Sequence, residues 1–184
     1  MNHFRIESKH FGGEVVVISP VENYTDHRGF FSVPYQKYEL QELGLPGEFV
    51  QDIHSRSVKN VIRGLHFQYS PPMGKLMRCT RGEAFLVTVD LRENSPTYLH
   101  WLGVIATEEN QTQVWAPALF ARGFCALSDI TEVQYKCTST FNGRNDIAIR
   151  WDDPDIGVMW PTKNPILSDR DKNAPTIKEL CGKK

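Results

Sequence analysis

The sequence predicts an all-β fold of the sandwich or barrel kind, with many short strands around a concave interior. Three observations support this prediction. Strand-like apolar runs recur along the chain, several of them alternate between apolar and polar residues, and turn residues separate them. A jelly roll is a common solution for such a pattern, although the pattern alone leaves the type of sandwich open.

The predicted strands follow one another from residue 13 to residue 153. In order they are GEVVVISPV, DHRGFFSVPY, FVQDIHSRS, VIRGLHFQ, GKLMRCTRG, EAFLVTVDLR, HWLGVIAT, TQVWAP, GFCALSD, TEVQYKCTST and IAIRWDD. Alternation is clearest in EAFLVTVDLR and TEVQYKCTST. Only residues 35–44 and the segment from Ser168 predict helices, the second with Ser168 as its N-cap.

Length and composition indicate one globular domain over residues 1–184, with 40% hydrophobic and 23% charged residues. The formal net charge of −1 provides no broad basic field, so we expect neither nucleic acid nor a membrane as a partner. The sequence contains no run of 18 apolar residues, and its N-terminal segment does not resemble a secretory leader. We therefore expect a cytoplasmic protein.

The cysteines and histidines give no sign of a bound metal or other cofactor. The four cysteines contain no C-x-x-C pair, and three of them lie in apolar segments where a free thiol acts as a small hydrophobic group. The six histidines form no H-x-H or H-x-x-x-H pair of the kind that metal sites use. We expect no cofactor and no metal.

The stretch NVIRGLHFQ, residues 60–68, places Arg63 and His66 three positions apart in one predicted strand. Side chains of an ideal strand alternate between faces, so these two would point in opposite directions. Gly64 lies between them, and glycine permits a bulge that re-aims a neighbouring side chain. Either the strand is straight and one residue faces solvent, or it is bent and both face one pocket.

Each candidate residue has a structural interpretation beside the functional one. His66 could be a core histidine with one hydrogen bond, or a general base, because its ordinary pKa lies near neutrality. Tyr135 could be a core tyrosine or a proton donor. Arg28 could be a turn residue or a phosphate ligand. Asp169 and Asp171 could stabilise a helix start, or one of them could orient a histidine.

Nine segments together resemble the dTDP-4-dehydrorhamnose 3,5-epimerase family of nucleotide-sugar biosynthesis. They are DHRGFF, FVQD, VIRGLHFQ, GKLMRCTRGE, VDLRENSPTY, FARGF, YKCT, RWDDPDIGVMWP and ILSDRDKNAP. The resemblance implies a cupin-type jelly roll, a double-stranded β-helix with a few short helices. It also implies a homodimer that acts without a metal on a nucleotide-linked 4-keto-6-deoxyhexose in deoxysugar biosynthesis.

The resemblance also implies a role for each matching residue. His66 corresponds to the base, Asp171 rather than Asp169 to its carboxylate partner, and Tyr135 to the acid. Lys75 corresponds to the cation near the C4 oxygen of the sugar. The implied substrate-binding residues are Arg28, Phe31, Gln51, Arg63, Arg122 and Phe141, of which Arg28 and Arg63 would bind phosphate.

The chain departs from the family pattern at four positions. Arg122 stands where the family has a second active-site histidine, and Leu86 stands where it has an aspartate. Val33 replaces a glutamate, and Phe141 replaces a tyrosine. These departures leave open whether C3, C5 or both are inverted, and whether the nucleotide is dTDP or another such as CDP. A metal-dependent cupin enzyme and a non-catalytic sugar-nucleotide binding module are the more remote alternatives.

Overall fold

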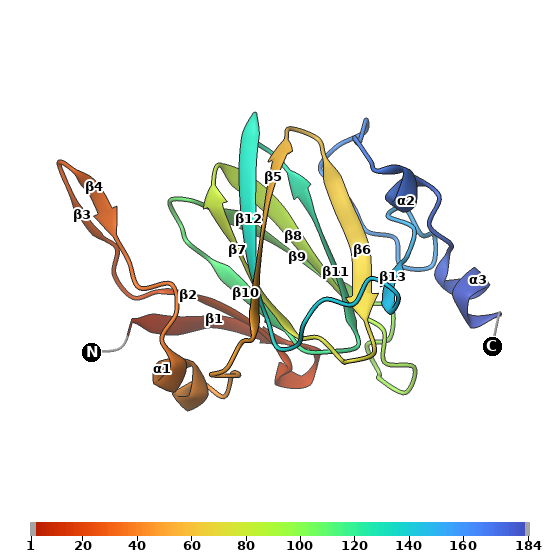
Figure 1. Ribbon diagram of the computed structural model, residues 1–184, viewed down its shortest axis with the longest axis horizontal. Coiled ribbons are helices and arrows are strands. Elements are labelled where there is room, and N and C mark those ends of the chain that lie inside the picture. Colours follow the sequence, from red (N-terminus) through yellow and green to blue (C-terminus); the bar gives the residue numbers. More distant parts are fainter. Residues whose placement is uncertain (1–2, 183–184) are drawn as a thin grey trace.

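The computed structural model describes residues 3–182, which form two antiparallel sheets on either side of an apolar core (Figure 1). The first sheet contains, in spatial order, β1 (Phe4–His10), β2 (Val15–Pro20), β10 (Gln113–Ala116), β7 (Lys75–Arg81), β12 (Ile130–Cys137) and β5 (Gln51–Val58). The second contains β13 (Asp146–Ala148), β6 (Ile62–Gln68), β11 (Phe120–Ala126), β8 (Glu83–Asp90) and β9 (Trp101–Thr107). The all-β prediction is confirmed.

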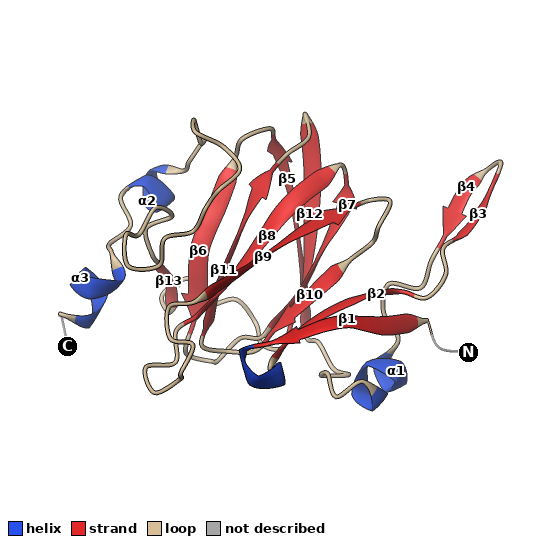
Figure 2. Cartoon of the chain, turned by 180° about the vertical axis from the view of Figure 1, so that it is seen from behind, coloured by secondary structure: helices blue, strands red, loops and turns tan. Residues whose placement is uncertain are grey.

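The observed strands overlap every predicted run, and two strands lie wholly or almost wholly outside the predicted runs. Strand β1 was missed because its sequence, FRIESKH, is mostly polar. It pairs with the buried strand β2 at the edge of the first sheet. Strand β3 (Tyr24–Asp26) has only three residues and pairs with β4 (Gly29–Phe31). These two strands form a hairpin that extends away from the sheets in both views (Figures 1 and 2).

Side chains from the inner faces of both sheets form the central core. It includes Val17, Met77, Leu86, Phe124 and Val133, which are all buried. Leu86 and Phe124 lie directly opposite each other on neighbouring strands, so the alternating pattern of EAFLVTVDLR directs one set of residues inward. The opposite set, including Val87 and Val89, packs under the C-terminal segment, so both faces of β8 are buried.

Four short helical segments lie outside the sheets: η1 (Phe11–Gly13), α1 (Lys37–Glu42), α2 (Asp169–Lys172) and α3 (Ile177–Cys181). The two predicted helical regions are confirmed, and the side chain of Ser168 accepts a hydrogen bond from the Asp171 amide as the predicted N-cap. The C-terminal region contains two helices, because Pro175 interrupts it between α2 and α3. Within residues 3–182, no helix is long and apolar enough to cross a membrane.

Candidate active site

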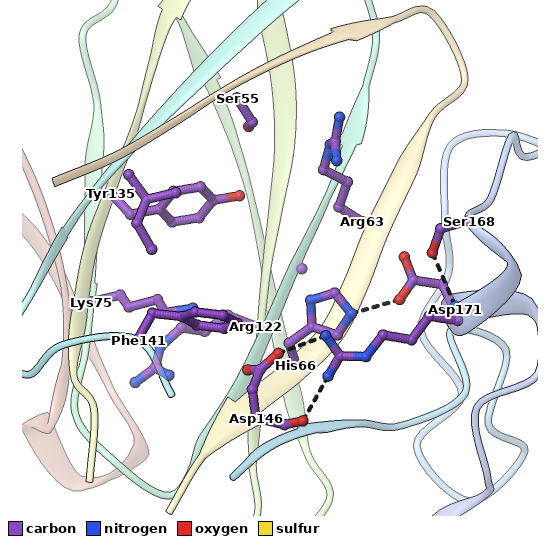
Figure 3. Close-up of a pocket in the computed structure, with 13 residues that line it drawn as sticks. Ser55, Arg63, His66, Lys75, Arg122, Tyr135, Phe141, Asp146, Ser168 and Asp171 are labelled. Atoms are coloured by element: carbon purple, nitrogen blue, oxygen red, sulfur yellow. Dashed lines mark hydrogen bonds and ion pairs between the residues drawn. The ribbon is translucent and has the colours of Figure 1, made fainter. Parts of the chain in front are cut away.

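A cavity of about 320 Å³ lies between the two sheets. Its walls come from β5, β7 and β12 of the first sheet, from β6, β11 and β13 of the second, and from the start of α2 (Figure 3). Most of the lining side chains are polar or charged: Ser55, Arg63, His66, Lys75, Arg122, Tyr135, Asp146, Ser168, Arg170 and Asp171. Polar groups on inward strand positions are costly unless they share partners or a ligand, so this cavity is the candidate active site.

Arg63 and His66 both face the cavity because β6 contains a bulge. In the pairing with β11, Arg63 lies opposite Phe124 and His66 lies opposite Arg122. One strand therefore advances by three residues while the other advances by two, which brings both side chains to the inner face. Gly64 makes this possible, since its φ of +137° and its close contact with Gly123 would strain any residue with a Cβ.

His66 and Asp171 form a hydrogen-bonded pair at one side of the cavity (Figure 3). The Nε2 atom of His66 lies 2.5 Å from Oδ1 of Asp171. Burial alone would raise the pKa of Asp171, but the hydrogen bond and charge of His66 hold it below its ordinary value. With Nε2–H donating to the carboxylate, the Nδ1 atom of His66 carries the lone pair that can accept a proton.

Tyr135 and Lys75 lie on the opposite wall, on neighbouring strands of the first sheet. The hydroxyl of Tyr135 points into the cavity (Figure 3), and the Nζ atom of Lys75 lies 5.5 Å from the centre of the tyrosine ring. Burial raises the pKa of Tyr135, so its hydroxyl remains protonated at neutral pH. Burial, followed by the charge of Arg122, lowers the pKa of Lys75.

Arg122 is buried below these residues, and the atom Nη2 donates to the carbonyl oxygens of Met73, Ala116 and Pro117. Its Nε and Nη1 atoms have no hydrogen-bond partner among the described residues. Leu86 belongs to the apolar core and does not line the cavity. The chain therefore surrounds this arginine with backbone carbonyls, and the departure at Leu86 is accommodated as ordinary core packing.

The predicted substrate-binding residues fall into two groups. Arg63 and Phe141 line the cavity, and the Gln51 side chain accepts a hydrogen bond from the Phe141 amide. Arg28 and Phe31 instead lie on the exposed β3–β4 hairpin, where Arg28 pairs with Asp26. Within a single chain, the structure does not bring these two residues to the cavity.

Sequence reasoning missed several residues of the cavity. Arg170 forms an ion pair with Asp146, with 2.7 Å between Nη1 and Oδ2, and its Nη2 atom donates to the Asp146 carbonyl. This pair ties α2 to β13, next in sequence to Asp171. The motif SDRD was a signal for Arg170, because Arg170 directly precedes Asp171 in the short helix α2. Asp146 had no such signal, because it stands at the start of an unremarkable short strand.

In the described part of the chain, no three His, Cys, Asp or Glu side chains gather closely enough to hold a metal ion. The four cysteines are free thiols, three of them buried.

Comparison with known proteins agrees with this geometry. The family model for dTDP-4-dehydrorhamnose 3,5-epimerase matches residues 13–179. The enzyme of that name from Methanothermobacter thermautotrophicus is 46% identical over 182 residues, covering 97% of each chain. The one from Escherichia coli is 43% identical, covering 98% of this chain and 96% of its own.

The solved structures include a dTDP-6-deoxy-D-glucose-3,5-epimerase from Legionella pneumophila in complex with dTDP-4-keto-L-rhamnose. It superposes on the present chain with a TM-score of 0.92 at 38% sequence identity, covering 98% of this chain and 96% of its own. This agreement confirms the cupin-type jelly roll. The chain belongs to the dTDP-4-dehydrorhamnose 3,5-epimerase family.

Proposed function

We propose that this chain is a sugar-nucleotide epimerase that inverts C3 and C5 of a dTDP-linked 4-keto-6-deoxyhexose in deoxysugar biosynthesis. One observation carries the proposal. His66 on β6 of the second sheet, paired with Asp171 of α2, faces the Tyr135 hydroxyl on the first sheet across a single cavity. Inversion at carbon requires a base on one face of the sugar and an acid on the other. Family membership supplies the substrate class.

The reaction begins with proton removal next to the C4 ketone. The lone pair on Nδ1 of His66 takes the proton from C3 or C5, and the C–H electron pair becomes the new C=C bond of an enolate. Asp171 then faces an imidazolium, whose positive charge it stabilises. Positioned proton transfer of this kind contributes roughly 10²–10⁴-fold to the rate.

The second half returns a proton from the opposite side. Tyr135 gives its hydroxyl proton to the carbon, the C=C electron pair forms the new C–H bond, and the C4 ketone is restored. The proton on His66 leaves to solvent and Tyr135 regains one from solvent, which closes the proton balance. Lys75, on the same wall as Tyr135, serves the C4 oxygen while negative charge develops there, and one fixed donor to such an oxyanion contributes about 2.7–4 kcal/mol.

The nucleotide is bound at the mouth of the cavity and by a second subunit. Arg63, Phe141 and Gln51 lie on the chain's own side, but Arg28 and Phe31 lie on the projecting hairpin. Phe30 and Phe31 are 57% and 65% exposed, which is unfavourable for aromatic side chains in water. We therefore propose a homodimer in which each hairpin delivers Arg28 and Phe31 to the cavity of its partner.

A solvent-exchange experiment tests the reaction. The protein is incubated in D₂O with dTDP-4-keto-L-rhamnose or its CDP-linked counterpart, and NMR follows deuterium entry at C3 and C5. The proposal predicts deuterium at both carbons of the dTDP sugar and far slower entry for the CDP sugar. Exchange at neither carbon would refute it. Metal analysis of the purified protein tests the expectation that no metal is needed.

One observation favours a single-centre epimerase as the second candidate. Arg122 lines the cavity where the family pattern has a histidine, and arginine is too basic to shuttle protons at neutral pH. Deuterium entry at C3 alone or at C5 alone would establish this variant. The cytoplasmic location stays a prediction from the sequence.

A further inference from the structure

Arg122 is anchored to the backbone on both sides of Lys75. Its Nη2 atom lies 2.9 Å from the Met73 carbonyl, two residues before Lys75 in the chain. The same atom lies 2.8 Å from the carbonyl of Ala116, which is the cross-strand partner of Lys75. The guanidinium is thus fixed to the segment that carries the lysine, while Nε and Nη1 have no hydrogen-bond partner within residues 3–182.

The two cations share one region of the cavity, and neither is paired with a carboxylate of the described residues. Neither Lys75 nor Arg122 belongs to any ion pair of the described residues, whereas Asp171 is paired with His66 and Asp146 with Arg170. Two like charges in a poorly solvated site disfavour each other's protonated forms. One of the two side chains therefore releases a proton more readily than it would in water.

Lys75 is the group that releases it. Three carbonyl oxygens accept hydrogen bonds from the Arg122 guanidinium, and the pKa of Arg122, lowered by burial to about 9, keeps it charged at pH 7. Lys75 has no comparable acceptors in the described chain, and its ammonium lies over the ring of Tyr135. The other charged or titratable groups around Lys75 are Tyr135 and Cys137 from β12, Arg63 and His66 from β6, Asp146 from β13, and Arg170 and Asp171 from α2.

We propose that Arg122 is a positioning residue for Lys75: the fixed charge of Arg122 makes the Lys75 ammonium a proton donor to the C4 oxygen of the substrate. The inference rests on the proposed function and deepens it. As His66 takes the carbon-bound proton, the ketone π pair moves onto the C4 oxygen. An N–H bond of Lys75 breaks, its electron pair stays on nitrogen, and an O–H bond forms. When Tyr135 protonates the carbon, the enol proton returns to Lys75.

The repulsion between Lys75 and Arg122 favours proton transfer from Lys75 to the substrate. Before the reaction, the two cations repel each other. Once Lys75 is neutral, that repulsion is gone, and the intermediate is a neutral enol in place of an enolate. A proton donor also works best when its pKa lies near the operating pH, and a fixed neighbouring charge moves a lysine in that direction.

The test measures the pH profile of deuterium exchange into dTDP-4-keto-L-rhamnose for the parent, Arg122→Met and Arg122→Lys. Arg122→Met removes the charge and keeps the volume. Because Lys75 then holds its proton more strongly, we expect the alkaline limb to move up by about one pH unit and the rate at pH 7 to fall by up to tenfold. Arg122→Lys restores a cation and should return the limb toward its original position. Should Arg122→Met fail to fold, Arg122→Gln replaces it, since its amide can still donate to the carbonyls.

A direct titration of Lys75 separates this inference from the proposed function. NMR of ¹⁵Nζ-labelled lysine, with the Lys75 signal assigned by its loss in Lys75→Arg, should show a higher pKa in Arg122→Met than in the parent. An unmoved signal and an unmoved alkaline limb would refute the role of Arg122, even if the parent exchanges both carbons. No exchange by the parent with any nucleotide 4-keto sugar would refute the proposed function itself. Lys75→Arg keeps the charge but cannot donate at neutral pH, so activity above a third of the parent rate would refute the donor role.

Discussion

Two pairs of ionisable side chains share the cavity, and they are built in opposite ways. His66 and Asp171 combine a base with a carboxylate at 2.5 Å, and the carboxylate side chain is only 5% exposed. Lys75 and Arg122 combine two cations, neither of which forms an ion pair with a carboxylate of the described chain, and backbone carbonyls hold the arginine. In the first pair a carboxylate balances the charge of the histidine, whereas the two positive charges of the second pair have no ion-pair partner among the described residues.

The difference shows where charge is expected to appear. A histidine that already has its carboxylate can become an imidazolium at little cost. Two uncompensated cations have the opposite preference, because negative charge on the ligand would relieve them. In the proposed reaction, positive charge develops at His66, and the proton that Lys75 donates neutralises the negative charge that would otherwise build up on the C4 oxygen. Each pair suits one of these changes, and substitutions that alter one pair at a time test this assignment.

Removing the base should have the largest effect. His66→Ala leaves Asp171 without its partner and the cavity without a proton acceptor, so exchange at C3 and C5 should fall by roughly 10³-fold or more. His54→Ala is the matched control, because His54 also bonds a carboxylate, Glu132, but does so on the exposed side of the sheet. Retention of more than a tenth of the parent exchange rate in His66→Ala would exclude His66 as the base.

Neutralising the carboxylate should have the next largest effect. Asp171→Asn keeps the shape of the pair but removes its charge, and we expect the exchange rate to fall by roughly 10²–10⁴-fold while the Kd for dTDP changes little. The exposed Asp52, which pairs with Lys136, provides the control variant Asp52→Asn. Equal losses in binding and rate would indicate a structural role for Asp171.

Acid titration sharpens the same comparison. The pKa of Asp171 is lowered in the folded protein, so its stabilising contribution is fully present above its ordinary pKa of 3.8 and is lost as pH falls through the lower folded value. Urea unfolding between pH 5 and pH 2 should therefore show a steeper loss of stability in the parent than in Asp171→Asn. Identical slopes would indicate that the His66–Asp171 pair contributes nothing to folding.

The sequence predicted the members of these pairs better than their surroundings. Alternation and turn residues were enough to predict most strands, because strands such as β5 and β12 bury one face and leave the other partly exposed. The bend at Gly64 was one of two open possibilities, since a bulge depends on the register with β11 and not on β6 alone. The carbonyl acceptors of Arg122 were not predictable, because a backbone oxygen has no signature in the sequence. For the same reason, Asp146 became visible as a cavity residue only once β13 was paired with β6.

The hairpin should affect binding more than chemistry. Arg28→Ala removes the proposed phosphate ligand from the partner's cavity, so KM should rise by about tenfold while kcat stays within about twofold. Arg150→Ala is the control, because Arg150 has a similar exposed ion pair with an aspartate two residues away.

A mixed dimer of Arg28→Ala and His66→Ala subunits tests whether the hairpin acts in the cavity of its own subunit or in that of the partner. If the hairpin acts in the partner, the Arg28→Ala subunit keeps its base and receives an intact hairpin, so low KM returns. Failure of the mixed dimer to recover a low KM would place Arg28 elsewhere.

The smallest substitution, Gly64→Ala, tests how closely the strand of His66 approaches the strand of Arg122. Gly64 lies against Gly123, one residue after Arg122, so it sets how closely the strand of His66 approaches the strand of Arg122. A Cβ at position 64 would lie 2.6 Å from the Cα atom of Gly123, in a backbone conformation that L-residues rarely adopt. Gly64→Ala should lower the free energy of unfolding by about 3 kcal/mol or more, through both clash and strain. Gly157→Ala separates the two causes, because Gly157 also has a positive φ but nothing within 4 Å of the added Cβ, and it should cost about 1 kcal/mol. Urea unfolding measures both values. Equal losses in the two variants would mean that the strands can separate freely at Gly64, and the close approach would then not fix the position of His66 relative to Arg122.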